Sequence, residues 1–167
     1  MEFLDRDSFK QFCNEFYSSL NNFNNLCITG YFSETIRADL QKIPKRKTCR
    51  VRLISPEFSL GSNRDKKNLE ALRKLADVGA EIKFNYRLHS RLLIAYNSYP
   101  NHHPRGLLVI GSFDYNTECI GQERYDAGIK TRNPDLIKSA IEFFEQVWND
   151  SETQILEQFL KDKNITT

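Results

Sequence analysis

Apolar residues recur along the chain at two spacings, one typical of helices and the other of strands. Helical spacing over residues 5–20 predicts an amphipathic helix that Asp5 or Asp7 can cap. The apolar positions of this helix are Phe9, Phe12, Cys13, Phe16, Tyr17 and Leu20. Short apolar runs then predict three strands, at residues 26–31, 50–55 and 81–86.

Two helices are predicted between these strands. A short helix that Ser33 can cap follows the first strand and ends before Pro44, because proline cannot continue a helix. A longer helix begins at Ser62 or Asn63 and runs to about residue 78. The order strand, helix, strand, helix, strand indicates parallel strands joined by helical crossovers.

The pattern changes in the second half of the chain. Two apolar runs, at residues 88–96 and 107–113, have only a polar loop between them and therefore predict a hairpin. Residues 126–131 predict one more strand. Asn133 followed by Pro134 is a typical helix start, and residues 151–154 resemble a capping box for a last helix.

These elements together predict an α/β fold in which helices flank a mixed, mostly parallel sheet. At 167 residues, the chain is expected to form a single domain with a sizeable core. Its content of 40% hydrophobic and 28% charged residues is ordinary for a soluble globular protein. The apolar runs are far shorter than a membrane span, so no membrane insertion is expected.

Cysteine usage and the amino-terminal sequence point to a cytosolic protein. The four cysteines have no Cys-x-x-Cys spacing, which disfavours a zinc site and a disulfide scaffold and favours reduced thiols. The first residues contain no basic segment followed by an apolar one, so we expect no signal peptide. His102 and His103 are adjacent in a loop and lack a nearby third ligand, so we expect no metal there.

Positive charge is concentrated in one stretch. Residues 1–110 contain 18 Lys and Arg against 11 Asp and Glu, whereas residues 111–167 contain 6 against 11. No acid interrupts residues 42–52, which is compatible with an anionic partner, although a solvated loop explains most such runs. We treat five residues as candidate nucleic-acid contacts, Lys45, Arg46, Lys47, Arg50 and Arg52.

Candidate chemistry lies beside the apolar runs of the second half. His89 and Arg91 are two residues apart, so in a strand they would share one face. Ser112 and Asp114 have the same spacing after the next apolar run, and Asp126 opens the third. If the three strands are neighbours, a nucleophilic base, a cation, a hydroxyl and two carboxylates converge in a way that suits handling a phosphate group.

This pattern resembles the phospholipase D-like superfamily, whose motif is His-x-Lys, then Gly-Ser-x-Asn, then Glu. The resemblance covers about residues 26–148, and the terminal helices would pack on this core. Arg91 replaces the Lys of the motif, Asp114 the Asn and Asp126 the Glu. The Asp that often follows the first strand is absent, and Tyr96 lies near its place. The chain therefore looks like a half-unit of the single-motif, endonuclease-like branch with a degenerate motif.

The resemblance implies metal-independent phosphodiester hydrolysis without a cofactor. His89 would be the nucleophile, and Asp126 is the candidate acid that orients it. Arg91 would clamp phosphate oxygens, and Ser112 would donate its hydroxyl. An ionised Asp114 would repel a phosphate unless it is protonated, paired or turned away.

In the superfamily the catalytic centre combines two motifs, and this chain carries one. The resemblance therefore implies a homodimer with both copies of His89 near the two-fold axis. The leading hypothesis is a nuclease acting on nucleic acid. The alternatives are a degenerate module that binds nucleic acid or phosphate without cleaving it, and a purely structural domain in which Arg91, Asp114 and Asp126 form an ion-pair network.

Overall fold

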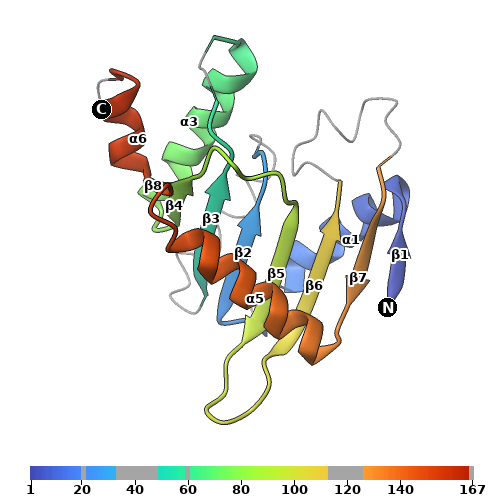
Figure 1. The fold of residues 1–167 in the computed structure, drawn as a ribbon. Helices are drawn as coiled ribbons and strands as arrows, with labels where there is room; N and C mark the ends of the chain where they lie inside the picture. The colour runs from blue at the N-terminus through green and yellow to red at the C-terminus, as the bar shows by residue number, and fades with distance from the viewer. Residues whose placement is uncertain (20–21, 33–48, 59–60, 113–125, 166–167) are drawn as a thin grey trace.

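The computed structural model describes residues 1–19, 22–32, 49–58, 61–112 and 126–165. These residues form one sheet with helices on both faces (Figure 1). The strands are β1 (Glu2–Leu4), β2 (Asn25–Thr29), β3 (Arg50–Ser55), β4 (Glu81–Phe84), β5 (Leu92–Asn97), β6 (Arg105–Gly111), β7 (Gly128–Thr131) and β8 (Gln154–Ile155). The helix predicted before Pro44 lies outside the described residues.

The sheet has the order β1-β7-β6-β5-β2-β3-β4-β8. Strand β3 pairs in parallel with β2 and with β4, which confirms the predicted crossovers. The predicted hairpin of β5 and β6 is also confirmed. The mixed α/β fold is therefore as expected, but the sheet is not mostly parallel. All other pairs are antiparallel, because β5, β6 and β7 follow one another across the sheet and two short edge strands add to it.

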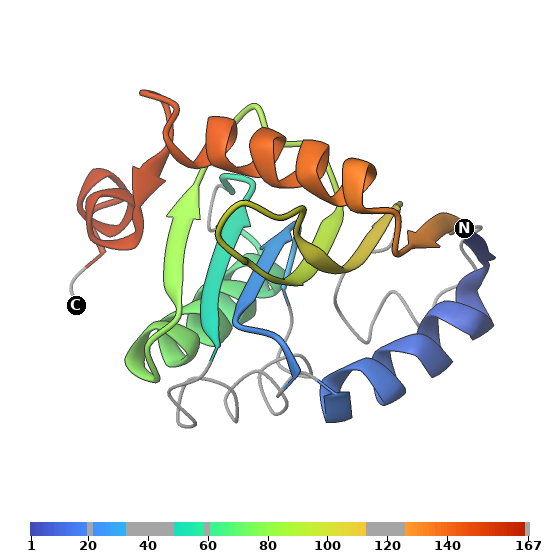
Figure 2. The same ribbon diagram turned by 90° about the horizontal axis from the view of Figure 1, so that it is seen from below.

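Helices cover both faces of the sheet, as Figure 2 shows. The helices in the described residues are α1 (Arg6–Ser19), α3 (Asn63–Asp77), α5 (Pro134–Trp148) and α6 (Leu156–Asp162). Side chains of α1, α3 and α6 pack against one face in the larger core cluster. Among the described helices, only α5 contributes to the second cluster, on the opposite face. The central strands are thus buried on both sides.

Side-chain caps fix the starts of three helices where the sequence predicted them. The carboxylate of Asp5 accepts from the backbone of Ser8 at 2.9 Å at the start of α1. The Ser62 hydroxyl accepts from the backbone of Asp65 at 3.0 Å at the start of α3. The Asn133 side chain accepts from the first turn of α5, with Pro134 as the first helical residue. Each cap satisfies backbone donors that the helix itself cannot.

Three predicted boundaries are wrong. The strand expected over residues 88–96 begins only at Leu92, and the strand expected from Asp126 begins at Gly128. The capping box predicted at residues 151–154 does not form, since Gln154 and Ile155 pair with β4 and α6 starts without a side-chain cap. None of the described helices is long and apolar enough to cross a membrane.

Candidate active site

One edge of the sheet brings together the three segments that carry His89 with Arg91, Ser112, and Asp126. The parallel strands β2, β3 and β4 end there, β5 and β7 begin there, and β6 ends there, because β5 is antiparallel to β2 and β6 is antiparallel to both its neighbours. The backbone of Gly111 donates to the carbonyl of Arg91 at 3.2 Å. One step further, the backbone of Ser112 donates to the carbonyl of Ala127 at 3.0 Å. The three chain segments therefore meet at this edge, as predicted.

His89 lies in a loop rather than in a strand, which corrects the sequence-based geometry. The Asn85 side chain accepts from the backbone of Arg87 at 2.8 Å, and the Leu88 backbone donates to the Asn85 carbonyl at 3.2 Å. This turn ends β4 and delays the start of β5. The spacing of two therefore does not place His89 and Arg91 on one strand face: His89 is exposed, whereas Arg91 is partly buried.

The His89 ring is presented to solvent. Among the described residues it has no hydrogen-bond or ion-pair partner, and no hydrogen bond joins it to Asp126. An exposed imidazole at a loop tip can approach a phosphate without first breaking an internal contact. The sequence assigned Asp126 the role of orienting His89, but among the described residues Asp126 accepts from Ser112 and has no hydrogen bond with His89.

Thr29 anchors the loop that carries His89. This residue ends β2 and is fully buried. Its hydroxyl accepts from the backbone of Leu92 at 3.0 Å and lies 3.0 Å from the carbonyl and 3.1 Å from the hydroxyl of Ser90. The side chain thus ties the segment on either side of Arg91 to the end of the neighbouring strand. The sequence analysis missed this residue, and its only signal was a polar residue within the first apolar run.

The Arg91 guanidinium packs against its own loop. It lies over the Tyr31 ring, 5.2 Å from the ring centroid, and its Nη1 is 3.3 Å from the carbonyl oxygens of both His89 and Ser90. These contacts hold the guanidinium against the backbone of the segment that carries His89. Arg91 is therefore near the candidate nucleophile, as predicted, but is engaged with the backbone of its own segment.

Ser112 and Asp126 are brought together. The Ser112 hydroxyl donates to Asp126 Oδ1 at 2.7 Å and accepts from the backbone of Ala127 at 3.2 Å. Because the hydroxyl already donates its hydrogen to the carboxylate, it must rotate before it can donate to a phosphate. The predicted neighbour Asp114 lies outside the described residues.

The basic stretch contributes two described residues, and neither lies at this edge. Lys45, Arg46 and Lys47 lie outside the described residues. Arg50 begins β3, so it lies at the other end of the sheet, where its Nε and Nη2 contact the Glu81 carboxylate at 2.5 and 2.8 Å. These hydrogen bonds lower the pKa of the Glu81 carboxyl.

Arg52 is buried rather than presented to an anion. It is 4% exposed, and its guanidinium forms two hydrogen bonds with the Glu145 carboxylate, at 2.9 and 2.6 Å. The rings of Phe144 and Trp148 pack over the same guanidinium. Arg52 therefore fixes α5 on the sheet, and in this conformation its guanidinium is not exposed to contact a nucleic acid.

Thiols and metal ligands add no further chemistry to the described residues. Burial raises the pKa of Cys13 to about 12 and those of Cys27 and Cys49 to about 11, which is typical of unreactive structural thiols. In the same part of the chain, no group of three or more His, Cys, Asp or Glu side chains could hold a metal ion.

The fold is that of a phospholipase D-like half-unit, which confirms the resemblance at the level of the fold. Nuc from Salmonella typhimurium, a phospholipase D family member, matches with a TM-score of 0.64 at 15% identity over 86% of this chain and 89% of its own. NucT from Helicobacter pylori matches with a TM-score of 0.65 at 12% identity over 92% and 99%.

A third similar structure is much longer than this chain. The polyphosphate kinase from Porphyromonas gingivalis matches with a TM-score of 0.70 at 14% identity, over 90% of this chain but only 26% of its own. No family model and no curated protein matches the sequence. The similarity to these proteins is therefore one of fold.

Proposed function

We propose that this chain is a phosphodiesterase that cleaves nucleic acid without a metal, with His89 as its nucleophile. The observation that carries the proposal is the exposed His89 imidazole at the sheet edge where Arg91, Ser112 and Asp126 also lie. The fold shared with Nuc, a phospholipase D family member, supports phosphodiester chemistry at this edge. The nucleic-acid substrate rests on the resemblance to single-motif endonucleases and on the basic stretch before β3.

The reaction would proceed in two displacements. A neutral nitrogen of His89 attacks phosphorus, and a P–N bond forms as the P–O bond to the leaving alcohol breaks. The His89 imidazolium of a second copy gives its proton to that oxygen. Water then attacks the phosphohistidine, the P–N bond breaks, and the second imidazole takes the proton from water. Both copies of His89 return to their starting states.

This chemistry requires a homodimer, and the structure offers a surface for one. Phe3 is paired with Ile129, and Ile129 with Ile110, so the three side chains form a row across β1, β7 and β6. They are 70%, 41% and 47% exposed. Because Ile110 directly precedes Gly111 at the candidate edge, a second copy covering this row would lie beside the site.

The first test is cleavage of labelled single- and double-stranded DNA and RNA in excess EDTA. The wild type should cut, and His89→Ala should not, while both melt at the same temperature because the exposed His89 ring has no hydrogen bond or ion pair among the described residues. Cutting that requires Mg²⁺ and survives His89→Ala would contradict the proposal. Ile129→Glu should give monomers by light scattering and lose cleavage, and an Ile129→Glu monomer that cuts normally would exclude the dimeric site.

A second candidate function is binding without cleavage. Two contacts favour it, since the Ser112 proton points to Asp126 and the Arg91 guanidinium contacts carbonyls of its own loop. Both groups would have to reorient to contact a phosphate. In this case neither wild type nor His89→Ala would cut, and both would retain salt-sensitive binding to nucleic acid.

A further inference from the structure

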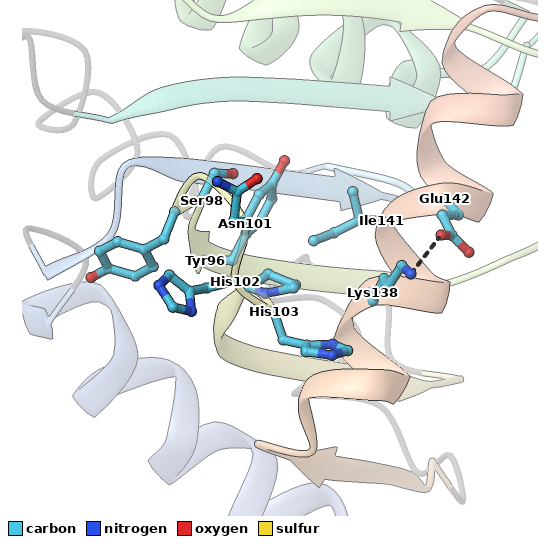
Figure 3. A pocket seen from close by; sticks show the side chains of 10 residues that line it. Tyr96, Ser98, Asn101, His102, His103, Lys138, Ile141 and Glu142 are labelled. Atoms are coloured by element: carbon cyan, nitrogen blue, oxygen red, sulfur yellow. Dashed lines mark ion pairs between the residues drawn. The ribbon is translucent and has the colours of Figure 1, made fainter.

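Two adjoining grooves lie at the end of the sheet opposite His89. The first, of about 500 Å³, separates the loop between β5 and β6 from α5 (Figure 3). The second, of about 460 Å³, lies on the other side of the same loop, beside the start of α5. His102, His103 and Pro104 line both grooves and so form a ridge between them. Volumes of this size suit single nucleotides rather than whole domains.

The floor of the first groove is fixed by buried contacts. Tyr96 is 5% exposed, and its hydroxyl accepts from Arg52 at 3.4 Å. Arg52 is itself held by the two hydrogen bonds to Glu145 on α5. The loop above is also ordered locally, since the His102 backbone donates to the Tyr99 carbonyl at 3.3 Å. A ligand would therefore enter a groove that already exists, which reduces the entropy cost of binding.

Cations flank the ridge on both sides. Arg105 and Arg132 line the second groove, and within the described residues neither side chain has an ion-pair or hydrogen-bond partner. Lys138 lines the first groove and is 3.9 Å from Glu142. That pair and the 3.5 Å contact of His103 with Asp135 are exposed, and exposed ion pairs are weak enough for a phosphate to displace.

An exposed aromatic ring also lines the first groove. Tyr99 lines the first groove and is 47% exposed, so one side of its ring is open to a stacking partner. Grooves that combine cations with exposed aromatic rings are typical of single-stranded nucleic-acid binding, because unpaired bases can stack and the backbone can follow the charge. A duplex keeps its bases stacked on one another and cannot use Tyr99 in this way.

The position of the grooves separates them from the candidate active site. Tyr96 lies four residues along β5 from Leu92, which places it about 13 Å from the start of the strand at the edge near His89. Arg50 lies at the groove end, because Asn25 is paired with Tyr96 on one side and with Arg50 on the other. Strand β3 therefore begins at the groove end of the sheet.

We propose that the two grooves hold a short stretch of single-stranded nucleic acid that crosses the ridge, with phosphates on Arg105, Arg132 and Lys138 and a base stacked on Tyr99. This site would hold the substrate at a distance from the cleavage edge and favour single strands over duplex. The inference rests on the proposed nucleic-acid substrate, but it requires binding only and does not require cleavage.

The test is fluorescence anisotropy of a short labelled oligothymidylate in EDTA, over a range of salt concentrations. Replacing both Arg105 and Arg132 with Ala should lower the slope of log affinity against log salt by about 1.4, because each phosphate contact on a single strand contributes about 0.7. Tyr99→Ala should weaken binding roughly 5- to 100-fold, the loss expected for one base–aromatic stack, and Tyr99→Phe should retain it.

Lys161→Ala on α6 is the matched control, since it removes one exposed positive charge far along the chain from both grooves and should leave affinity unchanged. A duplex of the same sequence should bind more weakly than the single strand. The proposal is overturned if the double arginine variant keeps the wild-type slope, if Tyr99→Phe loses as much affinity as Tyr99→Ala, or if the duplex binds more tightly. A protein that binds in this manner but never cuts would refute the nuclease proposal and leave this site in place.

Discussion

Arg52 and Glu145 join the centre of the sheet to α5 through two hydrogen bonds, Nη1 to Oε2 at 2.9 Å and Nη2 to Oε1 at 2.6 Å. The guanidinium also contacts the sulfur of Cys27 and the hydroxyl of Tyr96, each at 3.4 Å. The phenol at one end of this network is the floor of the first groove. The same ion pair therefore holds a helix on the sheet and shapes a candidate binding site.

Glu145→Ala should destabilise the protein by about 3 kcal/mol, because it leaves the buried Arg52 charge without its partner. Urea unfolding followed by circular dichroism measures the change. Glu142→Ala, one turn earlier and exposed, is the matched control and should change the free energy of unfolding by less than about 0.5 kcal/mol. Equal losses in the two variants would show that the bidentate contact contributes nothing specific.

Replacing the pair with apolar residues should restore most of the stability. In Arg52→Met with Glu145→Leu no buried charge remains, and such exchanges are often neutral or stabilising. The rings of Phe144 and Trp148 would pack on the Met side chain in place of the guanidinium. A double variant as unstable as Glu145→Ala would mean that the fold depends on this charge itself.

Stability should fall as the solution becomes alkaline. Burial raises the pKa of Tyr96 to about 12 and that of Cys27 to about 11, above their ordinary values. Between about pH 9 and 12 the unfolded chain therefore loses protons that the folded chain keeps, so the free energy of unfolding decreases with rising pH. Urea titrations at several pH values measure the slope. Tyr96→Phe removes one of the groups and should flatten the decrease, and an unchanged slope would contradict the assignment.

The sequence predicted the apolar strands and the capped helices well because both depend on local patterns. Asn133 with Pro134 starts α5, and Ser62 caps α3, since each side chain bonds to its own helix. The edge strands β1 and β8 have three and two residues, too short for any periodic pattern. Their positions are set by the neighbouring strands that they pair with.

Arg52 shows why the charge run was misleading. The residue belongs to a run of basic residues, but β3 lies between β2 and β4 with helices on both faces, so every residue from Val51 to Ser55 is buried. A basic residue inside such a strand is buried, so its charge does not face solvent or an anionic partner. The partner Glu145 is 93 residues away in sequence, so no local pattern could have found it.

The candidate active site at the edge near His89 was predicted in part. Strand order brought Ser112 and Asp126 together because both flank neighbouring strands, and this follows from patterns that sequence contains. The loop geometry of His89 did not follow, because the Asn85 side chain closes a local turn after β4 and the Thr29 hydroxyl bonds to Leu92 on a neighbouring strand. The Thr29 contact joins segments 63 residues apart, so no local pattern could have predicted it.

Thr29→Val should reduce cleavage more than tenfold in kcat while the protein remains folded. The substitution keeps the shape of the side chain and removes the hydroxyl that accepts from Leu92 and contacts Ser90, so the His89 loop loses its anchor. The expected loss of stability is about 1–3 kcal/mol, since a buried backbone donor loses its partner. Thr29→Ser retains the hydroxyl and should retain kcat. If Thr29→Val cuts normally, the loop does not depend on this anchor.

Asp126→Asn should weaken the contact with Ser112 and test whether it matters for the reaction. The carboxylate now accepts the Ser112 proton at 2.7 Å, and a neutral amide would accept it less strongly. If Ser112 acts only through Asp126, then Ser112→Ala should lower the rate in the wild-type background and have little further effect in Asp126→Asn. A double-mutant cycle on single-turnover rates measures this coupling. Fully additive losses would mean that the two side chains act independently, with Ser112 rotating away from Asp126 to donate to the phosphate.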